Sequence, residues 1–257
     1  MSVLGVVISA LGLFAGSLLN LCTDRLPHGG SLNPPILFSP CCKKPKKLYE
    51  RIPVLGYILA NGKCAQCSAR VSLRYPVMEL ASALAFFFLF KHYGLSLEFF
   101  VNTFFVLLLL LVSFMDLSSR AVPGILGIGG LSIGFLLAFF RKPLFFYQDA
   151  VYGIFVCGGI LFVIAFCCQN FLKKEVLGFG DIIVLCTIGA FCGLKGAVFS
   201  LLAGSLLGTL IGIPMMLLKG KNAKYAIPFG PFLSLGALFF MSFGDRFIYA
   251  FLSFVSG

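Results

Sequence analysis

The sequence predicts an all-α protein that crosses a membrane several times. Of its 257 residues, 60% are hydrophobic and 11% are charged, whereas charged residues make up about a quarter of a typical soluble domain. Several apolar runs reach about 20 residues, the length that spans a bilayer as a helix. These observations exclude a soluble globular domain. The net charge of +11 does not indicate nucleic-acid binding, because the basic residues gather in loops between apolar runs, as membrane topology requires.

Eight segments are predicted to be transmembrane helices. The first starts directly after Met1 and Ser2, without the basic region that precedes a cleavable signal sequence, so we expect it to be retained. In order, the segments are 3–22, 77–92, 99–116, 124–140, 150–169, 177–194, 197–218 and 229–254.

Local signals set the boundaries of the later segments. Only the short stretch Gly193-Leu194-Lys195-Gly196 marks the boundary between the sixth segment and the seventh. Pro228 and Pro231 cannot sit inside a regular helix, so they mark the start of the eighth. Because Asp245 and Arg246 interrupt the last run, we expect its final turns at the membrane interface.

The predicted organisation is a first transmembrane helix (1–22), a cysteine-containing loop domain (23–76) and a multi-helix membrane domain (77–257).

The distribution of Lys and Arg predicts the orientation of these parts in the membrane. Fifteen basic residues lie on the side of the loop and five on the opposite side, which places the loop in the cytoplasm and both termini outside. Nine of the fifteen are in the loop itself: Arg25, Lys43, Lys44, Lys46, Lys47, Arg51, Lys63, Arg70 and Arg74.

Two acidic residues are predicted to share one membrane depth. Asp116 ends the third segment, and Asp181 lies about one turn inside the sixth, in Gly178-Phe179-Gly180-Asp181. The orientation puts both at the cytoplasmic ends of their segments. An ionised group in a membrane costs roughly 2.5–3.5 kcal/mol, so such an acid is a functional candidate.

A pair of close carboxylates supports acid–base hydrolysis. Like charges in a low dielectric keep one proton between them. The ionised member then takes a proton from water while the protonated member polarises a scissile carbonyl, as in aspartic proteases. Gly178 and Gly180 would let a substrate backbone approach closely. The alternative is that these four residues form a turn at the start of a helix, capped by Asp181.

Five motifs in order resemble those of a known family. The chain is similar to the bacterial prepilin peptidases, or type IV leader peptidases, which are aspartic membrane proteases of the Gly-x-Gly-Asp type. The motifs are Gly16-Ser17-Leu18-Leu19-Asn20 with Arg25-Leu26-Pro27, Arg74-Tyr75-Pro76 with Glu79, Asp116 with Pro123, Gly178-Phe179-Gly180-Asp181, and Pro228-Phe229-Gly230-Pro231-Phe232.

The resemblance implies an activity, a location and partners. It implies that Asp116 and Asp181 are the catalytic pair of a peptidase in the bacterial cytoplasmic membrane. The implied substrates are type IV prepilins and type II secretion pseudopilins, cut on the cytoplasmic side after a glycine to remove a short basic leader. It also implies N-methylation of the new terminus with S-adenosylmethionine as donor, although no motif in the sequence indicates where that cofactor binds. Proteolysis itself requires no cofactor.

Two positions near these motifs raise separate questions. Glu79 could bind the leader or a substrate amine, or it could form a salt bridge with Arg74. Many family members carry a lysine two residues after the second aspartate, where this chain has Ile183. Without that cation we expect Asp181 to be less stabilised as an anion.

Four cysteines of the loop, Cys41, Cys42, Cys64 and Cys67, predict a structural zinc site. On the reducing cytoplasmic side a metal is favoured over disulfides, and Cys64-Ala65-Gln66-Cys67 has the spacing of half a zinc ribbon. The other half is irregular, because Ser39 replaces the first cysteine of the Cys-Pro-x-Cys that the family shows. Cys41 or His28 would then supply the fourth ligand, and a loop of free cysteines is the alternative.

Other classes of protein share part of this pattern. A transporter or channel can hold paired acids, but it more often shows internal repeats and acids near the bilayer midplane. A catalytically silent component of a pilus or secretion apparatus would keep the fold and tolerate loss of either acid. An intramembrane protease of the presenilin type would not be expected to carry the cysteine loop or Arg74-Tyr75-Pro76.

Overall fold

The computed structural model describes two compact helical units. They comprise Met1–Ser118 and Ser119–Gly257. The described residues are 3–28, 42, 48–119, 122–140, 146–172, 178–218 and 228–256. Within these ranges the regular structure is helical, and β structure is limited to one isolated bridge between Lys63 and Arg70. The prediction of an all-α chain is therefore confirmed.

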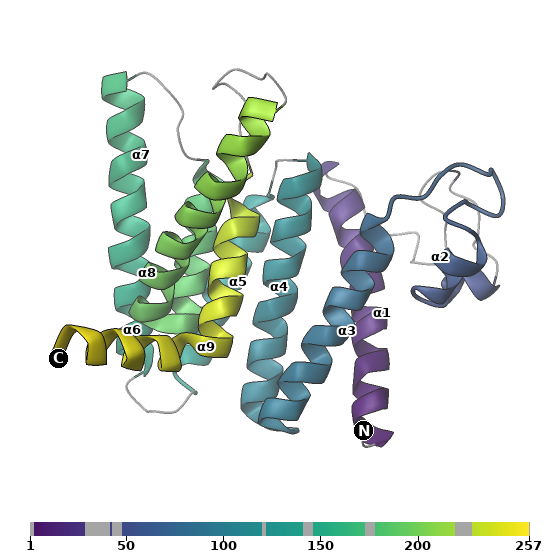
Figure 1. Ribbon diagram of the computed structural model, residues 1–257, viewed down its shortest axis with the longest axis horizontal. Helices are drawn as coiled ribbons and strands as arrows, with labels where there is room; N and C mark the ends of the chain where they lie inside the picture. Colours follow the sequence, from purple (N-terminus) through teal and green to yellow (C-terminus); the bar gives the residue numbers. More distant parts are fainter. Residues whose placement is uncertain are drawn as a thin grey trace. The chain divides into compact units, whose positions relative to one another are not determined.

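The first unit contains three long helices and the cysteine loop (Figure 1). The three long helices contain the first three predicted transmembrane segments. The loop between the first two helices contributes short helical turns. The elements are α1 (Val3–Arg25), η1 (Leu26–His28), η2 (Leu48–Arg51), α2 (Leu55–Leu59), α3 (Arg74–Tyr93) and α4 (Leu97–Ser119).

Small residues on α1 allow it to pack closely against α3, and the two helices lie side by side in Figure 1. A Cβ atom added to Gly16 would lie 2.5 Å from the Cα of Glu79, and one added to Gly12 would lie 2.7 Å from the Cα of Ala83. The hydrophobic effect does not drive helices together inside lipid. Glycines spaced four apart therefore often mediate helix contacts in membranes, because they let the two backbones approach closely.

Aromatic side chains join α3 to α4. The ring of Phe99 is buried and meets Phe86 and Phe90 edge to face, each with ring centroids 6.2 Å apart. The turn between the helices begins at Gly94, which has φ of 60° and donates its N–H to the carbonyl of Phe90 at 2.8 Å. Glycine adopts this left-handed conformation without steric cost, which explains why α3 ends there.

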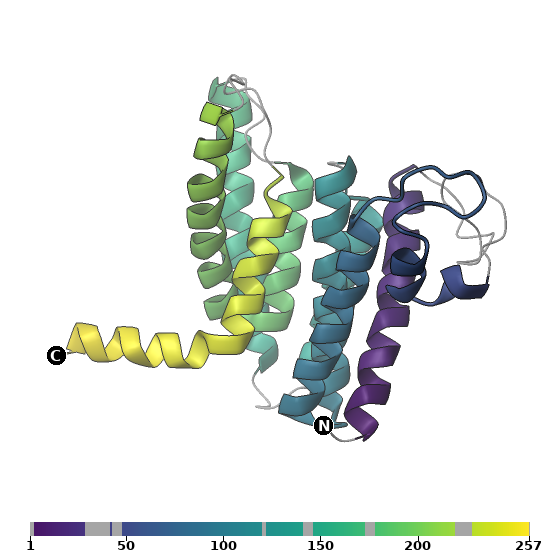
Figure 2. The ribbon, with the colours of Figure 1, turned by 45° about the vertical axis from the view of Figure 1, so that its right-hand side comes forward.

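The second unit contains the remaining predicted segments. Its elements are α5 (Gly124–Ala138), α6 (Phe146–Tyr152), the π-helical η3 (Gly153–Cys157), α7 (Gly158–Leu172), α8 (Phe179–Leu218) and α9 (Gly230–Ser256). The segment 150–169 is distributed over α6, η3 and α7. Figure 2 shows that the end of α9 turns away from the direction of its beginning.

The long helix α8 is interrupted where the sequence predicts a boundary. Gly193 has φ of 69° and ψ of −173°, which is outside the helical region, so α8 consists of two helices that meet there. A side chain at this position would overlap the carboxylate of Asp149 from α6. One turn earlier, a Cβ on Gly189 would lie 2.5 Å from the backbone of Gly153 in η3. The break therefore sits beside a close crossing of two backbones.

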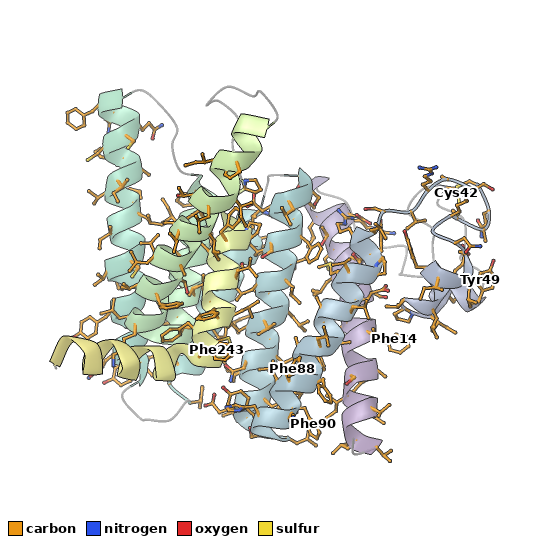
Figure 3. The ribbon with its side chains drawn as sticks, viewed as in Figure 1. Phe14, Cys42, Tyr49, Phe88, Phe90 and Phe243 are labelled. Atoms are coloured by element: carbon orange, nitrogen blue, oxygen red, sulfur yellow. The ribbon has the colours of Figure 1, made fainter. Side chains whose placement is uncertain are left out.

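Length and composition support insertion in a membrane. Within the described ranges, four helical stretches are long and apolar enough to cross one, namely Val3–Arg25, Leu97–Ser119, Tyr147–Phe171 and Phe179–Pro214. Gly124–Ala138 and Gly230–Gly244 are shorter apolar helices. The predicted segment 77–92 is not in the first group because α3 carries polar residues, of which Glu79 and Ser82 are buried. Large apolar side chains such as Phe14, Phe88 and Phe243 are exposed (Figure 3), as expected for residues that face lipid.

Candidate active site

The two candidate catalytic acids lie near helix ends. Asp116 is in the last turn of α4 in the first unit, and Asp181 is in the first turn of α8 in the second. Both side chains are partly exposed. Each acid is therefore at the end of the helix at which the sequence places it, and the membrane depth shared by the two stays a prediction. Their pairing across the two units stays a prediction.

The Gly-x-Gly-Asp motif forms the start of α8. Gly178 precedes the first helical residue, Phe179, and its carbonyl accepts the N–H of Asp181 at 3.0 Å. The turn at the start of a helix, which was the alternative hypothesis for these four residues, is therefore present. Asp181 is not its cap, however, because Asp181 lies within the first turn and Gly178 occupies the capping position. The positive end of the helix dipole favours a carboxylate at this place.

The described packing does not explain why positions 178 and 180 are glycines. A Cβ on Gly178 would lie 3.6 Å from Oδ2 of Asp181, and one on Gly180 would lie 3.8 Å from Cβ of Val122. Both are ordinary van der Waals distances, in contrast to the overlaps at Gly16 and Gly189. Among the described residues, a methyl group at either position would therefore make an ordinary contact without overlap.

Ile183 belongs to the core of the second unit. It is 8% exposed, and its side chain occupies the space where a Cβ on Gly127 of α5 would lie. At this position, where many family members have a lysine, the chain therefore has an apolar contact between α5 and α8.

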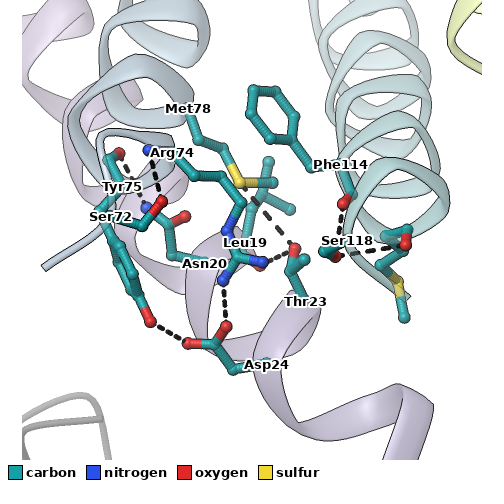
Figure 4. A network of polar contacts seen from close by, with 11 residues as sticks. Leu19, Asn20, Thr23, Asp24, Ser72, Arg74, Tyr75, Met78, Phe114 and Ser118 are labelled. Atoms are coloured by element: carbon teal, nitrogen blue, oxygen red, sulfur yellow. Dashed lines mark hydrogen bonds and ion pairs between the residues drawn. The ribbon is translucent and has the colours of Figure 1, made fainter. Parts of the chain in front are cut away.

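A polar cluster joins the end of α1 to the start of α3 (Figure 4). Arg74 forms an ion pair with Asp24, and the hydroxyl of Tyr75 donates to Oδ2 of Asp24 at 2.5 Å. Asn20, which is 2% exposed, donates from Nδ2 to the carbonyl of Tyr75 at 3.0 Å. Burial, and then the hydrogen bond to Asp24, raise the pKa of Tyr75 above its ordinary value. Residues from two of the sequence motifs therefore stabilise one helix contact.

Glu79 uses both carboxylate oxygens within the protein. It is 9% exposed, and its Oε1 accepts the hydroxyl of Ser17 at 2.5 Å. Its Oε2 accepts the backbone N–H of Val54 at 2.7 Å. Arg74 pairs with Asp24 instead, and in the described part of the chain no Lys or Arg nitrogen is within salt-bridge distance of Glu79. Of the two alternatives for Glu79, the salt bridge with Arg74 is therefore wrong, and sequence reasoning missed Asp24 as the partner of Arg74 and Val54 as a partner of Glu79.

Three of the four predicted metal ligands come together. The Sγ atoms of Cys42, Cys64 and Cys67 all lie within 4.8 Å of one another, and those of Cys42 and Cys64 are 3.9 Å apart. Zinc–sulfur bonds of about 2.3 Å in a tetrahedron separate thiolates by about 3.8 Å, so this triad fits a zinc ion. Cys41 and the side chain of His28, the two candidates for the fourth ligand, lie outside the described residues.

A small hairpin positions two of these cysteines. The N–H of Cys64 donates to the carbonyl of Ala69 at 2.9 Å, and the N–H of Val71 donates to the carbonyl of Gly62 at 2.8 Å. Gly62 has φ of 67°, a conformation that glycine adopts without steric cost, so it permits the tight turn just before Cys64. Cys64 is buried and Cys67 is exposed. Figure 3 labels Cys42, which belongs to the preceding part of the loop.

The fold and these residues define a class of protein: a polytopic helical membrane protein with the residue set of an aspartic membrane protease. Residues 10–93 match the family model for the bacterial peptidase A24 N-terminal domain, and residues 103–213 match that for the type IV leader peptidase family. The chain belongs to the type IV leader peptidase family.

Similar proteins cover nearly the whole chain. A prepilin leader peptidase/N-methyltransferase of Pseudomonas putida is 30% identical over 94% of this chain and 91% of its own length. A protein of the same name from Legionella pneumophila is 28% identical over 95% of this chain and 92% of its own length. A type 4 prepilin-like proteins leader peptide-processing enzyme of Escherichia coli is 29% identical over 88% of this chain and 89% of its own length. No solved structure matches the chain.

Proposed function

We propose that this protein is a membrane aspartic endopeptidase that removes the basic leader of type IV prepilins and of type II secretion pseudopilins. The observation that carries the proposal is that Asp116 and Asp181 both lie inside the region that matches the type IV leader peptidase family. The relatives that match over nearly the whole chain are named for cleavage of prepilin leaders. The proposed location is the bacterial cytoplasmic membrane.

Asp116 and Asp181 are the proposed acid–base pair. Asp116 lies in the last turn of α4 and Asp181 in the first turn of α8. The ionised member of the pair would take a proton from the attacking water while the protonated member donates a hydrogen bond to the scissile carbonyl. The two roles would exchange as the leaving amine is protonated.

The proposed substrate suits the depth predicted for these acids. A prepilin carries its leader just before an apolar helix. If that helix docks among the membrane helices while the leader stays in the cytoplasm, the scissile bond arrives at the cytoplasmic ends of α4 and α8. Because Gly178 and Gly180 carry no side chain, they would let the substrate backbone approach Asp181 closely.

N-methylation of the new terminus is the proposed second activity. The names of the relatives combine the peptidase with an N-methyltransferase. The methyl donor proposed for this chain is S-adenosylmethionine, and no residues are assigned to its binding.

The test is cleavage of a prepilin and of a pseudopilin by the purified protein in detergent, followed by mass spectrometry of the products. We expect cleavage directly after the glycine, so that each product lacks its leader. When S-adenosylmethionine is added, each product should be heavier by one methyl group. Uncut precursors under conditions where a related enzyme cleaves them would favour the silent assembly component. Cleavage without methylation would retain the peptidase and reject the second activity.

A structural zinc ion is proposed at Cys42, Cys64 and Cys67, with Cys41 or His28 as fourth ligand. In such a closed site the ion would hold the loop together without taking part in hydrolysis. We expect the protein to be purified with about one zinc ion per chain and the Cys64→Ser variant to lose most of it.

The matched control is Cys168→Ser on α7, which removes a thiol outside the cluster. We expect its zinc content, measured by atomic emission, to equal that of the wild type. Equal zinc contents in the wild type and the Cys64→Ser variant would favour the loop of free cysteines.

A further inference from the structure

We propose that Glu79 is a positioning residue that holds the cysteine loop on the α1–α3 helix pair, so that metal binding by the loop is coupled to the end of that pair. The inference rests on the proposed zinc site and not on the proposed peptidase activity. All of its contacts lie within the first unit.

Glu79 connects three parts of the chain at one carboxylate. It projects from α3, accepts the Ser17 hydroxyl of α1 on one oxygen, and accepts the Val54 N–H of the loop on the other. A buried carboxylate is tolerated where hydrogen bonds replace its hydration, and hydrogen bonds to a charged acceptor are stronger than neutral ones. Because both oxygens are used in this way, Glu79 is better suited to holding the loop than to binding a leader.

The backbone of Val54 shows that this contact constrains the loop. Val54 has φ of 61° and ψ of −53°, a conformation that is a genuine outlier for a β-branched residue. Strain of this kind persists where surrounding contacts determine the backbone. The hydrogen bond to Glu79 is such a contact, because it fixes the direction of the Val54 N–H immediately before α2.

Three further contacts connect α2 to the cysteine hairpin by two routes. Gly56 packs on η2, where an added Cβ would lie 2.8 Å from the Cα of Glu50. Glu50 in turn accepts the N–H of Ala65, between Cys64 and Cys67, at 2.9 Å. Independently, the hydroxyl of Tyr57 on α2 donates to the carbonyl of Val71 at the end of the hairpin at 3.3 Å.

These contacts imply a reciprocal effect between the metal and Glu79. A metal that orders the hairpin favours the state in which α2 and Val54 are docked. Thermodynamic linkage then requires that loss of docking weaken metal binding by the same factor by which the metal strengthens docking. Among the described residues, the hydrogen-bond partners of Glu79 are Ser17 and Val54 and not a cysteine. An effect on metal affinity would therefore not be expected if Glu79 stabilised only the helix pair.

The experiment measures two quantities in the full-length protein in detergent: zinc affinity, by chelator competition, and amide exchange of residues 54–59. In the wild type, removal of zinc should speed exchange in this segment. In Glu79→Ala, exchange should be fast with or without zinc, and zinc affinity should fall by about tenfold, within the usual range of coupling between sites. Glu79→Gln, which keeps one acceptor oxygen, should give intermediate values.

The control variant is Glu98→Ala, which removes an acid from the first turn of α4 and should leave both measurements at wild-type values. Glu50→Ala tests the same coupling from the loop side and leaves the buried carboxylate intact, so it serves if Glu79→Ala does not fold. The proposal would be overturned if Glu79→Ala kept the zinc affinity of the wild type and its zinc-dependent exchange. If only Glu50→Ala folds, the same result in that variant would overturn it. A wild-type protein that does not bind zinc would also overturn it. Prepilin cleavage measured in the same preparation reports separately on the proposed peptidase.

Discussion

Replacing either Asp116 or Asp181 by asparagine is expected to lower the rate of prepilin cleavage by on the order of 10²–10⁴-fold, the usual contribution of a positioned general acid or base. Asparagine keeps the shape of the side chain but can neither take a proton from water nor return one to the leaving amine. Since the proposed reaction needs one ionised and one protonated carboxyl group, each substitution should be about as damaging as both together.

The measurement is cleavage of a purified prepilin by detergent-solubilised variants, with thermal unfolding and membrane insertion recorded for each. Asp149→Asn is the matched control, because it changes an acid of the second unit that packs at the break in α8 and has no role in the proposed reaction. We expect this variant to cleave at close to the wild-type rate. Near-full activity in a folded Asp116→Asn or Asp181→Asn variant would refute the proposed mechanism.

Apolar run length made the helices predictable. The segments 77–92 and 99–116 lie within α3 and α4, and the four residues at the boundary of the sixth and seventh segments include Gly193, where α8 is interrupted. Each of these features depends on neighbouring residues: a run of apolar side chains, or a glycine that can leave the helical conformation. The π-helical turn of η3 was not predicted, because its apolar residues fit a regular helix equally well.

Long-range polar contacts were not predictable in the same way. Arg74 and Glu79 are near each other in the sequence, which suggested a local salt bridge, but their partners are Asp24 on α1 and Val54 in the loop. Hydrogen-bond partners depend on how helices and loops pack, and the periodicity of the sequence does not indicate that packing. The Cys64 and Cys67 half of the cysteine cluster was predictable because ligand spacing in a short hairpin is itself a local pattern. Cys42 was predicted from the resemblance to the family's Cys-Pro-x-Cys. The pairing of Asp116 with Asp181 rests on topology and resemblance.

Gly16→Ala is expected to destabilise the protein, although alanine usually stabilises a helix. In a helix interior alanine is favoured over glycine by about 1 kcal/mol. At position 16, however, the added methyl group would lie 2.5 Å from the Cα of Glu79, and backbone cannot give way as a flexible side chain can. Overpacking of this kind costs about 1–3 kcal/mol, so the net effect should be a lower unfolding temperature. Gly16→Leu should be more severe.

Gly129→Ala separates helix propensity from packing. Gly129 lies inside α5, and a Cβ there would meet no described atom within 4 Å. This variant gains the helix propensity of alanine without the overlap, so its unfolding temperature in detergent should equal or exceed that of the wild type. If Gly16→Ala were as stable as Gly129→Ala, α1 and α3 could not be packed backbone to backbone at this point. The geometry that brings Ser17 to Glu79 would then have to be different, because Ser17 follows Gly16 directly on the same helix.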